Sequence, residues 1–142
     1  MKVITLIQPW ATLVALGEKQ IETRSWSTNY RGEIAIHAGK KIDKSVFDQP
    51  YYFEVFKKNG LTPDNIITSA IIATCKIKDV KRTEDLKYRI SIKELAFGNY
   101  EPNRYGWILE DLNCIEPIEG VKGMLGLWNY DMENEVQYIN KT

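Results

Sequence analysis

Apolar and polar residues alternate along this chain in short runs that predict strands separated by short helices. The first run, Val3–Ile7, is rich in β-branched residues and predicts a buried strand that ends at Gln8-Pro9. After the proline, residues 10–16 carry apolar side chains at helical spacing, and Gly17 is a typical residue for ending that helix. The chain is therefore expected to open with a strand followed closely by a helix.

Two more predicted strands follow, and a polar turn joins them. Residues 19–24 are predicted to form the first strand, and residues 29–32 the turn. Residues 33–38 are predicted to form the second strand, in which Ile34 and Ile36 share one face.

The second half of the chain continues with long apolar runs and polar breaks. Asp43 can cap a helix that runs to about Lys58 and closes at Asn59-Gly60. Residues 66–81 contain the longest β-branched run and predict a central strand. The remaining predicted elements, in chain order, are a helix starting at Thr83, a short helix over 91–97, a loop over 98–104, a strand over 105–112 and a final strand or turn over 123–130.

This order of elements is too rich in strands for a doubly wound parallel fold. The chain has no regular strand–helix–strand rhythm and no glycine-rich phosphate loop. An α+β fold, a small mixed and partly closed β-barrel with short helices covering its ends, fits the pattern better. With 142 residues the chain is expected to form a single domain over residues 1–142, large enough to bury a core without a metal or disulfides.

Composition and charge narrow the class of partner. The chain is 44% hydrophobic and 27% charged, and its 19 basic residues are balanced by 19 acidic ones. A net charge of zero argues against a protein that coats DNA, which would be strongly basic. A local basic cleft is compatible with this sum, because the local field depends on where the charges lie.

Cysteine, histidine and hydropathy patterns predict a cytoplasmic protein without cofactors. Cys75 and Cys114 lie in apolar strand-like runs and are predicted to be free thiols. One histidine and the lack of a Cys-x-x-Cys pair argue against a bound metal. The apolar run at the N-terminus is too short for a secretory signal, and no run reaches the ~20 apolar residues of a membrane span. We therefore expect no membrane association.

Two clusters of polar and aromatic residues carry the candidate chemistry. The first spans residues 8–31, and the second spans residues 97–111. Tryptophan stacks on planar rings and arginine forks onto oxyanions, so the two together suit a nucleotide. The rings available for stacking are Trp10, Trp26, Tyr30 and Tyr105, and the cations available for phosphates are Lys19, Arg24, Arg31 and Lys40. Glu22, His37 and Arg104 complete the candidate set.

These clusters resemble the ASCH domain, a member of the PUA-like superfamily. The resemblance rests on the ordered motifs Gln-Pro-Trp, Gly-x-Lys-x-x-Glu-x-Arg-x-Trp, Arg-Gly and Arg-Tyr-x-Trp, and it covers residues 4–128. It looks closest to the branch found in activating signal cointegrator proteins and their small bacterial relatives. The resemblance implies a PUA-like β-barrel with a role in RNA metabolism or transcription coactivation. It also implies a cleft between the first helix and the barrel, with Lys19, Glu22 and Arg24 on its floor and Trp26, Tyr30 and Arg31 at its rim.

Two positions depart from the family pattern. Asn103 stands where a glycine often precedes the Arg-Tyr pair, and asparagine also tolerates a left-handed turn. Residues 123–126, Gly-Met-Leu-Gly, replace a stretch that usually carries a polar glutamine or arginine. Any ligand contact that relatives make there is lost in this chain.

Hydrolysis at the same cleft is the alternative to binding alone. Some members look like amidohydrolases of N4-acylated cytidine, in which a lysine activates a threonine three positions on and a glutamate moves a proton. Lys19 is in register, but Glu22 occupies the third position, and Thr23 would lie on the opposite face of a regular strand. Ribonuclease activity has also been suggested for such proteins, and Glu22, Lys19, Arg24 and His37 supply the acid, base and cation types that it needs.

Structural roles compete with functional ones at several positions. Glu22 and Arg24 share a strand face and could simply pair with each other. A lone histidine in an apolar strand, such as His37, is more often a satisfied structural residue than a catalyst. Trp107 and Trp128 are predicted to fill the barrel.

Overall fold

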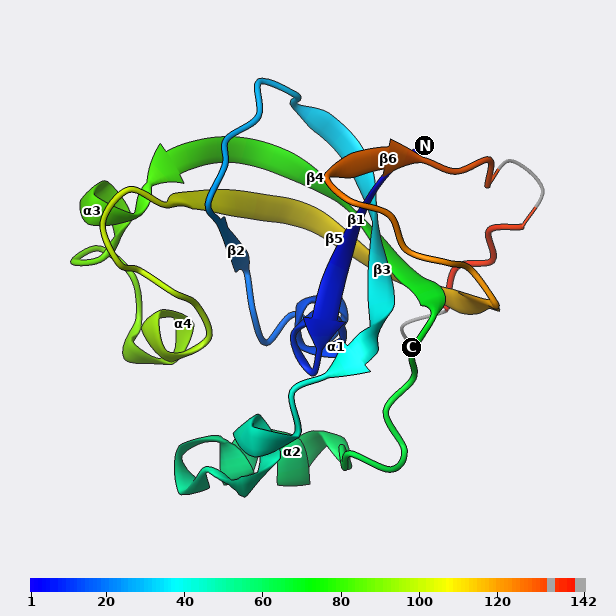
Figure 1. Ribbon diagram of the computed structural model, residues 1–142, viewed down its shortest axis with the longest axis horizontal. Helices are drawn as coiled ribbons and strands as arrows, with labels where there is room; N and C mark the ends of the chain where they lie inside the picture. Colours follow the sequence, from blue (N-terminus) through cyan, green and yellow to red (C-terminus); the bar gives the residue numbers. More distant parts are fainter. Residues whose placement is uncertain (133–134, 140–142) are drawn as a thin grey trace.

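A mixed six-stranded sheet in the order β2-β5-β4-β3-β1-β6 forms the centre of the computed structural model, which describes residues 1–132 and 135–139 (Figure 1). β1 and β3 are parallel, and the other neighbouring pairs are antiparallel. The strands are β1 (Lys2–Gln8), β2 (Ile21–Arg24), β3 (Gly32–Ile42), β4 (Ala70–Arg82), β5 (Tyr105–Glu119) and β6 (Leu127–Asn129).

The long strands curve the sheet without closing it. The β4–β5 ladder shifts register three times, first between Ile71 and Ala73, and such irregularities bend a strand. The sheet ends at β2 and β6, which do not pair with each other in the described part of the chain, so the predicted barrel is not closed. These two strands have only four and three residues, which leaves little backbone for a closing ladder.

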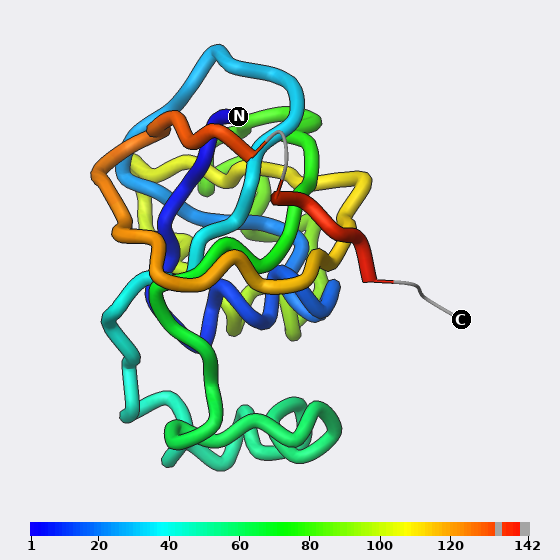
Figure 2. The backbone as a smooth tube through the Cα atoms, turned by 90° about the vertical axis from the view of Figure 1, so that its right-hand side faces the viewer, coloured from blue at the N-terminus to red at the C-terminus, as the bar shows by residue number. Residues whose placement is uncertain are grey.

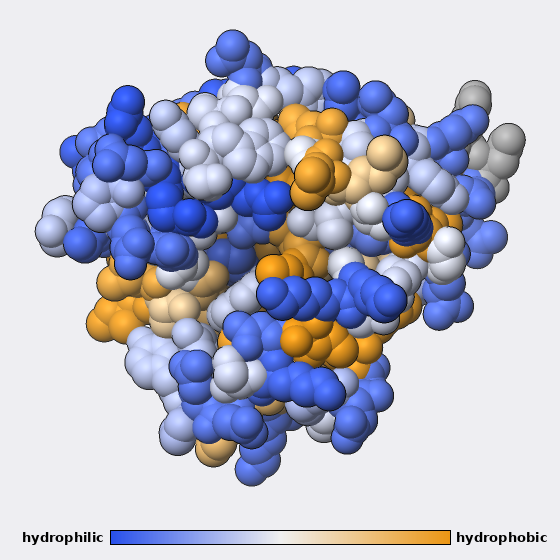
Figure 3. All heavy atoms as spheres, viewed as in Figure 1, coloured by the Kyte–Doolittle hydropathy of each residue, from blue (hydrophilic) through white to orange (hydrophobic). Residues whose placement is uncertain are grey.

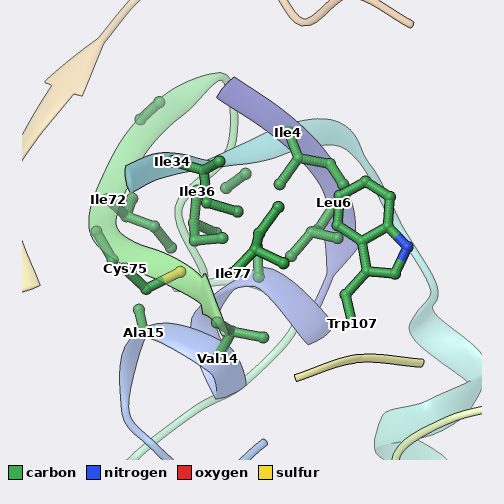
Figure 4. Close-up of a cluster of buried hydrophobic side chains, with 14 residues drawn as sticks. Ile4, Leu6, Val14, Ala15, Ile34, Ile36, Ile72, Cys75, Ile77 and Trp107 are labelled. Atoms are coloured by element: carbon green, nitrogen blue, oxygen red, sulfur yellow. The ribbon is translucent and has the colours of Figure 1, made fainter. Parts of the chain in front are cut away.

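One face of the sheet packs on the first helix, α1 (Trp10–Ala15). Ile4 and Leu6 of β1 point toward Val14 of this helix, and Trp107 of β5 closes the cluster (Figure 4). Trp107 is fully buried, as predicted. Because α1 follows β1 directly, this packing fixes the start of the chain against the middle of the sheet.

The opposite face of the sheet is also covered. Alternate residues of β1 and β3, including Val3 and Ala35, contact Ile115 and Trp128 on this side. Both faces of the central strands are therefore buried, which explains their near-continuous apolar sequences.

The helix predicted over residues 43–58 is interrupted. It consists of two 3-10 turns, η1 (Lys44–Asp48) and η2 (Pro50–Tyr52), followed by α2 (Phe53–Asn59). A proline disfavours helical backbone in the residue before it, and Gln49 is accordingly extended, with ψ of 118°. Figure 2 shows that this segment forms a lobe beside the sheet.

Two short helices precede the longest strand. They are α3 (Thr83–Leu86) and α4 (Ile92–Ala96), and the Ser91 side chain caps α4 by accepting from the Glu94 amide. β5 then runs beyond its predicted end at Leu112, because the left-handed Asp111, with φ of 53°, bends the strand without ending it. Within the described ranges, no helix is long and apolar enough to cross a membrane.

Candidate functional site

An open cleft of about 470 Å³ lies between β2, the end of α4 and the lobe that contains α2. Figure 3 shows this face of the molecule hollowed between the body of the sheet and the lobe. The aromatic rings of its lining contact one another, and its polar residues other than Gln49 are linked by hydrogen bonds and an ion pair. The polar members are Glu22, Thr23, Arg24, Gln49, Asn99 and Arg104, and the aromatic members are Trp10, Tyr52 and Phe97.

Glu22 and Arg24 form the pair that their spacing predicts, and the pair faces the cleft. Arg24 Nη1 lies 3.6 Å from Glu22 Oε2, and their side chains keep 24% and 11% of their exposure. The guanidinium also lies over the Trp26 ring, 5.7 Å from its centroid. A guanidinium has five N–H donors, so these contacts leave Arg24 able to bind an anion.

A second guanidinium, that of Arg104, enters the cleft from the start of β5. Its Nε donates to the Asn99 carbonyl at 3.2 Å, and its Nη2 reaches the Thr23 carbonyl at 3.4 Å. The preceding residue, Asn103, adopts the left-handed conformation expected from the family pattern, with φ of 67°. The turn therefore survives without glycine and aims Arg104 at the cleft.

Side chains also satisfy the carbonyls at the end of α4. Lys19 Nζ donates to the Phe97 carbonyl at 2.7 Å, and Tyr52 Oη donates to the Ala96 carbonyl at 2.9 Å. The last carbonyls of a helix have no partner within the helix, so they readily accept from such donors. These bonds hold one wall of the cleft between β2 and the lobe.

The same wall of the cleft includes Gly98, whose backbone lies very close to Tyr100 and to Thr23 of β2. A Cβ built on Gly98 would lie 2.7 Å from a Tyr100 ring carbon and 3.0 Å from Thr23 Cγ2. Next to it, the Asn99 amide donates to Thr23 Oγ1 at 3.0 Å. A glycine is therefore required for the 97–100 segment to pack this tightly on β2.

Lys19 lies beneath this wall and does not line the cleft. Only 2% of the residue is exposed, and its ammonium donates to the Ile21 carbonyl at 2.6 Å and to that of Phe97. Burial lowers the pKa of Lys19, and the nearby carboxylates of Glu22 and Glu94 partly oppose this shift. Of the three residues expected on the floor, Glu22 and Arg24 open into the cleft and Lys19 is sealed below it.

The Glu94 carboxyl, near Lys19, and the Tyr100 hydroxyl are two buried ionisable groups that the sequence analysis did not identify. Glu94 Oε1 accepts from the Gln20 amide at 2.7 Å, whereas Glu94 Oε2 and the Tyr100 hydroxyl have no hydrogen-bond partner among the described residues. Burial raises the pKa of both groups, and the carboxylates of Glu94 and Glu22 raise that of Tyr100 further. The only sequence signal was a Ser-x-x-Glu capping pattern at Ser91.

The lysine–threonine arrangement of the amidohydrolase hypothesis is not assembled here. The Thr23 hydroxyl accepts from the Asn99 amide, and the Lys19 ammonium donates to two carbonyls. In the described part of the chain no hydrogen bond joins the two side chains. Lys19 is therefore not placed to take the Thr23 proton.

The three residues expected at the rim lie outside the lining. Trp26 packs edge-on against Trp107, with ring centroids 4.8 Å apart, and touches the cleft region through Arg24. Tyr30 donates its hydroxyl to a backbone carbonyl, and Arg31 lies 3.5 Å from Asp79 in an exposed ion pair. The other candidates outside the lining are the exposed Lys40 and the half-buried Tyr105.

His37 is a buried structural residue on the opposite face of the sheet. Its Nδ1 lies 3.1 Å from Thr5 Oγ1, and its Nε2 lies 2.7 Å from the Val121 carbonyl. The Thr5 hydroxyl also accepts from Trp128 Nε1 at 3.0 Å. Burial lowers the pKa of His37, so the ring is held neutral and ties the 121 loop to the sheet.

Several lining residues come from segments whose role sequence reasoning missed. Tyr52 stands out in the sequence only as one member of an aromatic run, and Gln49 only as the residue before a proline. Their place in the cleft depends on how the lobe folds back toward α4, which no local pattern encodes.

Comparisons with known proteins agree with the motifs. A family model for the ASCH domain matches residues 4–120. The crystal structure of an ASCH protein from Zymomonas mobilis is 16% identical, covers 84% of this chain and 73% of its own, and has a TM-score of 0.52. The crystal structure of a point mutant of that protein is 17% identical, covers 84% of this chain and 75% of its own, and has a TM-score of 0.52. No curated protein matches the chain. At such identities the structures show the fold alone, but the family model spans most of the sequence, and the chain therefore belongs to the ASCH domain family.

Proposed function

We propose that this protein binds RNA, or a nucleoside-type unit of RNA, in the cleft between β2, α4 and the lobe. The observation that carries the proposal is the lining itself. Two guanidinium groups, a carboxylate and three aromatic rings line one open cavity. Membership of a family with a PUA-like fold, which is often linked to RNA, supports the same reading.

The two kinds of lining residue, aromatic and charged, suit the two chemical halves of a nucleotide. RNA is commonly recognised through unpaired bases that stack on aromatic rings and through polar contacts to base edges. Trp10 and Tyr52 provide rings for stacking, and Arg24 and Arg104 provide cations that can bind phosphate. Glu22 between them can accept from a base amino group.

Binding without chemistry is favoured over hydrolysis at this site. The buried Lys19 ammonium is engaged by two carbonyls, and the Thr23 hydroxyl is engaged by the Asn99 amide. His37, the histidine that a ribonuclease reading would recruit, packs on the other face of the sheet. We further propose a role in RNA metabolism as a binding domain of the cytoplasm, with transcription coactivation as the role that the resemblance to the cointegrator branch suggests.

The proposal is tested by replacing Arg24. Titration of a labelled single-stranded oligoribonucleotide should show that Arg24→Ala weakens binding by about 1–3 kcal/mol, because the guanidinium forks onto a phosphate or a base edge. Arg89→Ala is the matched control, since Arg89 is exposed and lies outside the cleft. Equal losses in the two variants, or none in either, would remove Arg24 from the binding site.

A further inference from the structure

We infer that the cleft accommodates one unpaired nucleotide, with its base on the aromatic side and its phosphate between Arg24 and Arg104. This inference rests on the proposed function. It adds the size of the unit that is recognised and the chemical group that the arginines bind.

The shape of the site sets the size of the unit. The cleft has a volume of about 470 Å³ and is walled by β2, by the 96–99 segment and by the lobe. Cavities of roughly 300–1,000 Å³ hold single small-molecule ligands. A hollow closed on several sides takes one splayed-out unit, whereas a binding track for a strand or a duplex would run openly across a surface.

The charges in the lining set the number of phosphates. Arg24 and Arg104 face a single carboxylate, Glu22, so the cleft carries one excess positive charge. Two other cations predicted to meet phosphates are engaged elsewhere, since Lys19 is buried and Arg31 pairs with Asp79. The chain as a whole has no net charge to attract a polyanion. A ligand with one phosphate matches this balance.

The direction of the ligand follows from the same residues. Glu22 repels a phosphate, so the anion is expected at the guanidinium groups of Arg24 and Arg104. Arg104 is held there in advance by the carbonyls of Asn99 and Thr23, which lowers the ordering cost of binding. The base then lies against the ring cluster of Trp10, Tyr52 and Phe97.

Calorimetric titration with nucleosides, nucleoside monophosphates and oligoribonucleotides of two, four and eight units tests the inference, using each of the four bases and an RNA duplex. We expect a monophosphate to bind about tenfold more tightly than its nucleoside, as a charge-assisted contact to two arginines implies. Longer oligomers should bind only a few-fold more tightly, because each offers several equivalent nucleotides to the cleft. The RNA duplex should not compete for the cleft. The logarithm of affinity should fall against that of salt concentration with a slope of about −0.7 to −1.4, which corresponds to one or two phosphates.

Arg104→Ala separates the phosphate contact from the base contact. It should lower monophosphate affinity about tenfold more than it lowers nucleoside affinity, while Arg89→Ala changes neither. Nucleoside and monophosphate binding of equal strength, or affinity that climbs by orders of magnitude with oligomer length, would overturn the inference and leave RNA binding intact. Failure of every RNA and nucleotide to bind would overturn the proposed function together with it.

Discussion

Single side chains bond together the segments that form the walls of this cleft. Lys19 joins the start of β2 to the end of α4 through two carbonyls, and Arg104 joins β5 to the Asn99 and Thr23 carbonyls. Lys19 belongs to the family motif, and in this chain it stabilises the packing around the cleft without lining it. A lysine identified from sequence as a site residue can lie under the site.

Replacing Lys19 by methionine should destabilise the protein. Lys19→Met keeps the apolar stem but leaves two buried carbonyls without a donor and removes a cation from beside the carboxylates of Glu22 and Glu94. Each buried group left unpaired costs about 1–3 kcal/mol. Urea unfolding measures the loss. Lys58→Met is the control, because its side chain is 68% exposed in a surface ion pair with Glu18, which contributes about 0–1 kcal/mol. Equal stability of the two variants would show that Lys19 has no structural role.

The single histidine of the chain gives a clean test of pH dependence. Burial lowers the pKa of His37 from the ordinary 6.5. At pH values between the folded pKa and 6.5, the unfolded chain therefore binds a proton that the folded chain does not. The stability from neutral His37 is therefore complete above about pH 6.5 and is lost as pH falls toward and through the folded pKa. Denaturant titrations from pH 7.5 to 5 should show this loss in the wild type and a smaller loss in His37→Gln. Parallel pH profiles of the two proteins would contradict the assignment.

Residue-scale outcomes show where sequence reasoning succeeds and where it fails. The Glu22–Arg24 pair follows from a separation of two in a strand and is present. From the sequence, His37 is a candidate because it lies at a predicted strand end beside lysines, and the sequence alone does not reveal which face of that strand meets the cleft. Glu94 was missed because its burial depends on how α4 packs against Gln20, a contact between residues 74 positions apart.

At the scale of elements, the cleft depends on a close approach between β2 and the segment after α4. Gly98→Ala should push this segment outward, because the added methyl group meets Tyr100 and Thr23 within 3.0 Å. Overpacking of this kind costs about 1–3 kcal/mol of stability, and it should also weaken ligand binding. Chemical unfolding and RNA titration of one preparation measure both effects.

Gly60→Ala is the comparison for that variant. Gly60 ends α2 in the left-handed conformation, with φ of 63°, and a Cβ there meets no atom within 4 Å. Its substitution should cost about 1–2 kcal/mol through backbone strain alone and leave RNA affinity unchanged. If both variants lose stability but neither loses affinity, the Gly98 wall has no part in binding.

Helices and strands could be predicted where residues close together in the sequence determine them. The strands of the central sheet and the helix after Pro9 follow from apolar periodicity, and Gly17 and Gly60 end helices as expected. The helix over 43–58 was wrong because Pro50 interrupts it, although that proline was visible in the sequence. The predicted, partly closed barrel is confirmed only as a mixed sheet with short helices, because closure depends on edge strands whose lengths no periodicity determines.

At the scale of the whole molecule, the cleft joins residues from four separate parts of the chain. The ordered motifs identified the family because they span most of the sequence, and the family model confirms that identification. The contribution of the lobe came only from the structure, which brings Gln49 and Tyr52 against the end of α4. Electroneutrality of the chain is compatible with this site, because its excess positive charge is local.

Amide chemical shifts offer the most direct measurement of whether this cleft is the ligand site. The ¹⁵N-labelled protein would be titrated with a nucleoside monophosphate and with a short single-stranded RNA, and shift changes would be mapped onto the structure. The account predicts changes concentrated at the Gly98 and Asn99 amides and at the Trp10 indole N–H. Changes gathered instead around Thr5, His37 and Trp128, on the other face of the sheet, would contradict it.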